Sequence, residues 1–267
     1  MKFLRFAGAA ASVLLLAFAP LTTRSPAHAA ATGTLTVFAA ASLKDAFTDL
    51  AAKFESAHPG VNVRFNFDGS QILETQIANG APADVFASAD QRWMEAAVSG
   101  GLVNNQAEFA RNSLVMIAQF DVHVHSLRDL TRDGLKLAIC AEQEPCGRYT
   151  RIALQKMSAD KTYWPTYGEQ VLRNVATQEQ NVEAVVQKVL LGEADAGFVY
   201  ATDVTQKGGV KLLNYPVPDQ DQVIATYPIA RVKASAQSQL AQAFIDYVLS
   251  EEGQAVLRSY GFRPPQA

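Results

Sequence analysis

The sequence predicts an α/β fold in two lobes, each a mostly parallel sheet with helices on both faces. In the first half of the chain, short apolar runs typical of buried strands alternate with amphipathic helical patterns. The second half repeats this plan without repeating the sequence. The chain has 267 residues, which is enough for a short leader and two lobes of ordinary size.

The first 30 residues predict a cleavable secretory signal peptide. Lys2 and Arg5 precede an apolar segment over residues 6–20, and Ala27-His28-Ala29 is a small-x-small cleavage signature. The segment is too short for a stable membrane span and no second long apolar run follows, so we expect an exported protein without membrane insertion. No cysteine stands at the cleavage site to carry a lipid, which fits the periplasm of a Gram-negative bacterium.

The charge balance argues against polyanionic partners. Losing Lys2, Arg5 and Arg24 with the leader takes the formal net charge from −3 to −6. We therefore expect no nucleic acid and no anionic membrane surface as partner. A small anionic ligand would have to be held by a few local donors against the field of the whole protein.

The first strand-to-helix junction carries a serine. The apolar run 35–40 predicts a strand, and apolar side chains at three-four spacing over 43–54 predict a helix. Ser42 and Asp45 have the form of a capping box, which predicts Ser42 at the helix N-cap. A hydroxyl at a helix N-terminus suits an anion, but a capping role alone also explains this serine.

A second serine occupies a similar junction. Alternating apolar residues over 61–67 predict a strand, and a helical pattern begins directly after Ser70. Gly69 lets a ligand come close to the main chain. Both junctions are expected at the carboxyl ends of strands, where ligands bind in open α/β sheets.

The second half of the chain has junctions of the same kind. Cys146 follows a predicted strand over 135–140 and a loop, and precedes a helix. Asn181 is predicted to cap a helix whose free N–H groups begin near Val182. Tyr200 ends a buried strand, where its hydroxyl is available as a donor.

The remaining elements complete the two lobes. We predict strands over 85–88, 112–118, 210–215 and 227–232, and helices over 90–98, 147–157, 236–249 and 253–260. The strand over 112–118 carries the chain out of the first lobe and the strand over 227–232 returns it. Lobe I thus comprises residues 31–113 and 227–267, and lobe II residues 114–226.

Cys140 and Cys146 are the two cysteines of the chain. In an oxidising compartment they are expected to form a disulfide, which would hold the loop between them in place before a ligand arrives. A metal site is the weaker alternative, because two cysteines without neighbouring histidines make an incomplete zinc shell.

Several phrases, in order, resemble a known family. They are VFAAASL at 37–43, GAPADVF at 80–86, SADQRWM at 88–94, NSLV at 112–115 and YGF at 260–262. Together they resemble the periplasmic molybdate-binding proteins of ABC transporters, and the resemblance covers nearly the whole mature chain. It implies a type II periplasmic binding protein fold, high-affinity binding of molybdate and tungstate, and delivery to a permease with its ATPase. It also implies a monomer with no cofactor and no enzymatic activity.

The resemblance further implies a site for one tetrahedral oxyanion, bound without a cation or any direct protein ligand to the metal. The serine hydroxyls of the first lobe are similar to Ser42 and Ser70. The backbone N–H donors of the second lobe are similar to those of Cys146 and Val182, and the tyrosine hydroxyl to that of Tyr200. Cys146 departs from the alanine of a relative, which a main-chain contact tolerates.

A site built only from donors predicts a selection rule. A ligand that carries a proton, such as hydrogen phosphate, leaves that proton unpaired in such a site. Molybdate and tungstate carry none at neutral pH. Sulfate carries none either, so only the size of the cavity excludes it.

A hydrolase with Ser42 or Ser70 as nucleophile is a weaker interpretation. Neither serine lies in a G-x-S-x-G elbow, and the chain has four histidines, one of them in the leader. His123 and His125 alternate on a strand-like segment, but two ligands without a third are typical of a solvated edge.

A receptor for another anion or for ferric iron is the second rival interpretation. Tyr149 and Tyr200 are candidate ligands for iron. A cation site also needs carboxylates, and the candidates nearby in sequence are Glu142 and Asp203.

Overall fold

The computed structural model describes Met1 and residues 32–204 and 212–266. Apart from Met1, the predicted signal peptide over 1–30 lies outside the described residues, as does the start of the strand predicted over 210–215. The described chain from residue 32 onward builds two sheets of five strands each.

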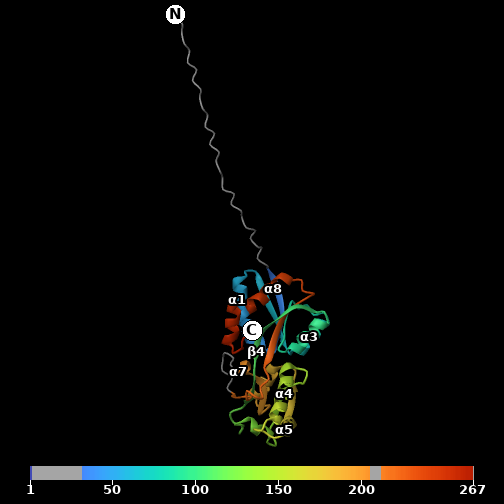
Figure 1. The fold of residues 1–267 in the computed structure, drawn as a ribbon, viewed down its shortest axis with the longest axis vertical. Coiled ribbons are helices and arrows are strands. Elements are labelled where there is room, and N and C mark those ends of the chain that lie inside the picture. Colours follow the sequence, from blue (N-terminus) through green and yellow to red (C-terminus); the bar gives the residue numbers. More distant parts are fainter. Residues whose placement is uncertain (2–31, 205–211, 267) are drawn as a thin grey trace. The chain divides into compact units, whose positions relative to one another are not determined.

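The first sheet has the strand order β2-β1-β3-β10-β4 (Figure 1). β1 (Gly33–Ala40) runs parallel to β2 (Val61–Asp68) and to β3 (Val85–Ala87). β10 (Ala225–Val232) runs antiparallel to β3 and to β4 (Val103–Asn112). The four predicted strands of this sheet are confirmed, and most of β4 was not predicted.

The second sheet has the strand order β7-β6-β8-β5-β9. β6 (Leu137–Cys140) runs parallel to β7 (Val175–Glu179) and β8 (Ala196–Tyr200). β5 (Leu114–Ala118) runs antiparallel to β8 and to β9 (Leu213–Pro216). Both sheets combine parallel with antiparallel pairings and are therefore mixed, whereas mostly parallel sheets were predicted. β7 was not predicted.

Helices flank the strands of both sheets. They are η1 (Ala41–Leu43), α1 (Lys44–Ala57), α2 (Ser70–Ala78), α3 (Gln91–Ser99), η2 (Leu127–Thr131), α4 (Pro145–Ala159), α5 (Tyr167–Arg173), α6 (Val182–Leu190), α7 (Ala201–Val204), α8 (Ser238–Leu249) and α9 (Glu251–Ser259). α4 and α5 pack against each other (Figure 1). In the described part of the chain, no helix has the length and apolar character needed to cross a membrane.

Aromatic packing shows why the amphipathic pattern of α1 forms a helix here. Phe47 and Phe54 are fully buried on one face of α1. Their rings lie 5.6 Å from Phe109 of β4 and 5.3 Å from Phe244 of α8, respectively. Burying a phenylalanine stabilises a fold by roughly 1.5–3 kcal/mol, so this face holds α1 against the first sheet.

The chain passes between the two sheets twice. The predicted strand over 112–118 is in fact two strands, because β4 ends at Asn112 in the first sheet and β5 begins at Leu114 in the second. The chain returns between β9 and β10. The two-lobed α/β fold is therefore confirmed, while the exact lobe boundaries stay a prediction.

Candidate binding site

The first sheet brings the two predicted serines to one edge. β1 and β2 pair with Ala40 opposite Asp68, so the two strands end level with each other. Ser42 follows β1 within η1, and Ser70 is the first residue of α2 after β2. Ser70 is fully buried and Ser42 is half-buried. Their predicted position at the carboxyl ends of neighbouring strands is confirmed.

The second sheet places the other three predicted residues at its own strand ends. Cys146 lies in the first turn of α4, Val182 is the first residue of α6, and Tyr200 is the last residue of β8. All three side chains are buried. Asn181 accepts a hydrogen bond from the N–H of Ala184, so the predicted N-cap of α6 is confirmed.

Direct hydrogen bonds join the edges of the two sheets. The Gln71 Nε2 donates to the Gln180 carbonyl oxygen at 2.8 Å, and the Asn181 Nδ2 donates to the Asp68 Oδ1 at 3.0 Å. Both bonds run between the β2–α2 junction and the residues that precede α6. The first turns of α2 and α6, which contain two of the predicted donors, are therefore neighbours.

Gly69 permits this contact. A Cβ atom built on Gly69 would lie 2.3 Å from the Gln180 carbonyl oxygen, closer than real Cβ contacts come. We predicted that this glycine lets a ligand approach the main chain; what approaches it here is the main chain of the segment before α6. Any side chain at this position forces the two segments apart.

The predicted capping role of Ser42 is wrong. A turn of 3-10 helix over 41–43 separates β1 from α1, and the N-cap of α1 is Leu43. The hydroxyl of Ser42 instead lies 2.9 Å from the Tyr227 hydroxyl. Because the serine is not used as a cap, capping does not explain its presence.

A polar chain links Ser42 to the second sheet. The Tyr227 hydroxyl also accepts a hydrogen bond from the Asn112 Nδ2 at 3.4 Å, and this amide donates to the Thr202 Oγ1 at 2.8 Å. The Tyr227 ring lies edge-on to Tyr200, with 5.9 Å between the ring centroids. Ser42 and Tyr200, from different sheets, thus contact the same tyrosine.

The Tyr200 hydroxyl is buried and has no hydrogen-bond partner among the described residues. Burial raises the pKa of this phenol well above its usual value, with a further contribution from Tyr227. Tyr200 is therefore a neutral donor at any physiological pH. Buried polar groups are normally paired, so this donor at a strand end is free to bind an acceptor.

Ser70 keeps a proton to donate. Its Oγ accepts a hydrogen bond from the Ala89 N–H at 3.0 Å, which leaves the hydroxyl hydrogen for another acceptor. Together with Ser42 and Tyr200, Ser70 gives a set of hydroxyls drawn from both sheets.

Glu144 is the polar residue at this edge that sequence reasoning missed. It is the N-cap of α4, and its Oε2 accepts the Gly147 N–H at 3.0 Å. The side chain is only 3% exposed. Burial raises the pKa of this carboxyl, hydrogen bonds from Gly147, Cys140 and Cys146 lower it, and the nearby Asp90 raises it slightly; together they bring the pKa to about 7.

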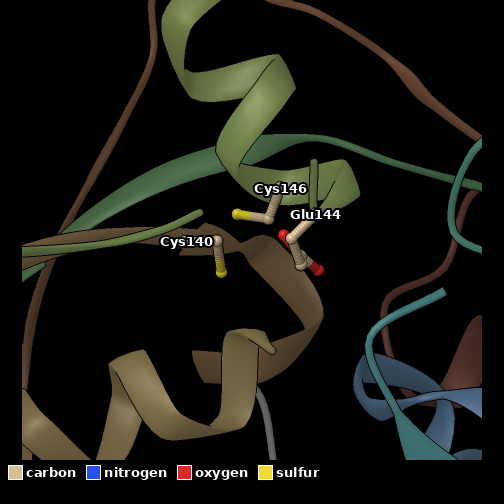
Figure 2. A group of neighbouring side chains, drawn as sticks. All are labelled: Cys140, Glu144 and Cys146. Atoms are coloured by element: carbon tan, nitrogen blue, oxygen red, sulfur yellow. The ribbon is translucent and has the colours of Figure 1, made fainter. Parts of the chain in front are cut away.

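The predicted disulfide is wrong for this structure. Cys140 and Cys146 are both free and buried. Figure 2 shows the two cysteine side chains close to each other and to Glu144, with no bond between the sulfur atoms. The Cys146 thiol donates instead to the Phe198 carbonyl oxygen at 3.5 Å. A sulfur–sulfur bond of about 2.05 Å needs both side chains to turn toward each other.

The metal alternative for these cysteines gains one ligand atom, from Glu144, but stays incomplete as a structural zinc site. The two sulfur atoms and one oxygen of Glu144 lie within 4.8 Å of one another, which gives three ligand atoms in this group. Structural zinc sites use four ligands. The carboxyl of Glu144 is already engaged as the cap of α4.

Cys140 and Cys146 are expected to be reduced in the purified protein, because both are free and buried in the structure. Denatured protein is expected to react with two equivalents of a thiol reagent without prior reduction, and native protein with almost none, because burial raises the pKa of both thiols. Mass spectrometry after alkylation counts the modified residues. Zero equivalents in the denatured, unreduced protein would restore the disulfide.

The sequence matches a family model over most of its length. The model described as "Bacterial extracellular solute-binding protein" matches residues 35–263. The chain belongs to this family of solute-binding proteins. The family is one of binding proteins, which agrees with the prediction that the chain is not an enzyme.

Curated relatives of this solute-binding protein carry a more specific name. The "Molybdate-binding protein ModA" of Mycobacterium tuberculosis is 37% identical over 234 residues, covering 86% of this chain and 85% of the relative. The protein of the same name from Escherichia coli is 34% identical over 240 residues, covering 86% of this chain and 89% of the relative.

Solved structures agree on the fold. The periplasmic molybdate-binding protein of Azotobacter vinelandii has a TM-score of 0.76 at 21% identity, covering 87% of this chain and all of that one. The sulfate-binding protein SubI of M. tuberculosis also has a TM-score of 0.76, at 16% identity and 86% coverage of both chains. The solute-binding fold is thus shared by receptors that are named for different oxyanions.

Proposed function

We propose that this protein binds molybdate as an intact oxyanion in the periplasm and delivers it to an ABC permease and its ATPase for uptake. The names of its relatives at 37% and 34% identity support this ligand. The signal peptide predicted over 1–30 supports export. The protein acts as a monomer without a cofactor.

The proposed site takes the anion between lobe I, residues 31–113 and 227–267, and lobe II, residues 114–226. The hydroxyls of Ser42, Ser70 and Tyr200 donate to its oxygens, together with the main-chain N–H groups of Cys146 and Val182. The observation that carries the proposal is the buried Tyr200 hydroxyl, a donor without an acceptor at the edge where the two sheets meet.

Neutral donors are sufficient for a dianion. Hydrogen bonds to a charged acceptor are roughly twice as strong as those between neutral groups, and helix N-termini add the positive end of the helix dipole. Tungstate has nearly the size and charge of molybdate, so the same donors hold it. Sulfate is smaller, so its oxygens reach fewer of them.

Ferric iron is disfavoured as the ligand. Iron binds tyrosine as phenolate, whereas burial raises the pKa of Tyr200 and of Tyr149 and keeps both phenols protonated. The Asp203 Oδ2 already accepts the Tyr200 N–H at 2.8 Å. Glu142 is exposed, whereas the Tyr200 phenol is buried.

Calorimetric titration of the purified protein, stripped of ligand, tests this function. We expect tight one-to-one binding of molybdate and tungstate, and weak binding of sulfate and phosphate. Absence of heat and of thermal stabilisation with all four anions would reject an oxyanion receptor, and ferric iron would be titrated next.

Ser42→Ala is expected to weaken molybdate binding by about 1–3 kcal/mol, a factor of roughly 5 to 150, because a hydrogen bond to a charged acceptor is lost. The Tyr227 hydroxyl, which contacts this serine, keeps its hydrogen bond from Asn112. Calorimetry measures the affinity, and Ser56→Ala, at an exposed position on α1, is the control. Equal affinity in Ser42→Ala and wild type would remove this serine from the site.

A further inference from the structure

The first turn of α4 has few N–H groups to offer an anion. Pro145 has none, and the Arg148 N–H bonds to the Glu144 carbonyl oxygen. Only Cys146 and Gly147 remain. The Gly147 N–H donates to the Glu144 carboxyl group, and the Cys146 N–H also interacts with this carboxyl, so an anion at Cys146 would share its donor with Glu144. An oxyanion at the Cys146 N–H therefore lies at the same helix end as a carboxyl group of this chain.

Two negative groups at one helix end repel each other strongly, because buried charges are poorly screened. The titratable groups that face Glu144 cannot relieve this repulsion. They are Asp90 before α3, Cys140 at the end of β6, Cys146 in α4, Tyr200 at the end of β8 and Asp203 in α7. Each of them is neutral or acidic, and none brings a positive charge.

Nearby cations act elsewhere. Arg92 and Arg148 interact with Asp90. Arg151 donates to the carbonyl oxygens of Cys140 and Gly147 and to the Gln178 side chain. Arg92 also donates to the Gln143 carbonyl oxygen at 2.6 Å, which directs its guanidinium outward along the loop before α4. A proton is therefore the available means of neutralising Glu144.

We propose that the oxyanion binds together with one proton, which Glu144 holds in the complex. The inference rests on the proposed function and deepens it. One carboxyl oxygen of Glu144 keeps accepting the Gly147 N–H. The other carries the proton and donates it to the anion, so that Glu144 becomes an additional neutral donor and determines how affinity depends on pH.

The direction of the pH effect follows from linkage. Below pH 7 the carboxyl is already protonated in the ligand-free protein, so affinity is flat and no proton is taken up. Above pH 7 the ligand-free carboxyl is ionised, and each binding event must take a proton from solvent. Affinity then falls by about tenfold per pH unit, or about 50-fold between pH 7 and pH 9.

Calorimetry in pairs of buffers with different ionisation enthalpies counts this proton directly. With molybdate as the probe, the wild-type protein is expected to take up about one proton at pH 8.5 and almost none at pH 5.5. This measurement needs no variant, so it holds even if substitutions at Glu144 impair folding.

Glu144→Gln assigns the proton to this residue. The amide keeps an oxygen to accept the Gly147 N–H and has an N–H₂ group to donate to the anion, so it imitates the protonated acid. This variant is expected to bind molybdate with the same affinity from pH 6 to pH 9 and without proton uptake. Glu142→Gln, at an exposed position in the same loop, is expected to behave like wild type.

The possible results distinguish failure of the proposed proton uptake from failure of the proposed molybdate binding. Molybdate binding by wild type without proton uptake at pH 8.5 would overturn the inference alone. So would a pH dependence that survives in Glu144→Gln. Absence of molybdate binding at both pH values would overturn the proposed function, and the inference with it.

Discussion

Gly69→Ala is expected to weaken molybdate binding by about 10- to 100-fold. The backbone at residue 69, with φ −62° and ψ 140°, accepts alanine without strain. The new Cβ, however, would lie 2.3 Å from the Gln180 carbonyl oxygen. Relieving such an overlap costs about 1–3 kcal/mol. It also moves Ser70 away from Val182, and so separates two of the proposed donors.

The loss should appear in affinity more than in stability. Gly69 and Gln180 belong to segments that follow strands of different sheets, so each sheet keeps its own packing when this contact opens. Calorimetry with molybdate and thermal unfolding without ligand separate the two effects. Gly100→Ala, where φ is −72° and the nearest atom to the new Cβ is 3.3 Å away, is the control. Wild-type affinity in Gly69→Ala would show that close contact between these segments is not needed for binding.

Local signals predicted most of the elements that position the site. The periodicity over 43–54 reflects which side chains of α1 are buried. Burial follows the alternation only in the first half of β2, because residues 65–68 are all half-buried. The side chain of Asn181 caps α6 as its residue type suggests. Ser70 directly follows the junction after β2, and Val182 directly follows the N-cap Asn181, so both positions could be predicted from the sequence.

Elements that depend on the tertiary fold were not predictable in this way. β7 has the sequence VATQE, with no fully buried side chain, and is held as an edge strand by main-chain pairing with β6. The break at Ser113 between β4 and β5 lies inside a region that was predicted as one strand. There the chain leaves one sheet for the other, and local hydrophobicity carries no signal for that change.

The two glutamates before α4 show the same limit for the site. Glu142 and Glu144 stand two residues apart in one polar loop, yet the first is exposed and the second is buried as an N-cap. Proline is favoured at the first position of a helix, so Pro145 was a signal that residue 144 is the N-cap. Glutamate is not a favoured N-cap type, so residue type pointed the other way. The predicted set of site residues therefore did not contain Glu144, which the structure places at the same helix end as Cys146.

Tyr200→Phe is expected to change affinity and stability in opposite directions. The variant removes a hydroxyl that has no partner in the described chain, so the ligand-free protein should gain about 1 kcal/mol in its free energy of unfolding. The same variant removes a hydrogen bond to a charged ligand, worth about 1.5–3 kcal/mol, so molybdate should bind roughly 10- to 150-fold more weakly.

Urea unfolding without ligand and calorimetry with molybdate measure the two changes. Tyr227→Phe is the matched control for stability, because its hydroxyl contacts Ser42 and Asn112 and its loss removes both contacts. Tyr227→Phe should therefore destabilise the ligand-free protein, whereas Tyr200→Phe stabilises it. A Tyr200→Phe protein that is less stable and binds molybdate as wild type does would mean that this hydroxyl serves the fold. A gain in stability with a loss in affinity would mean that the hydroxyl is kept, at a cost to the fold, for the ligand.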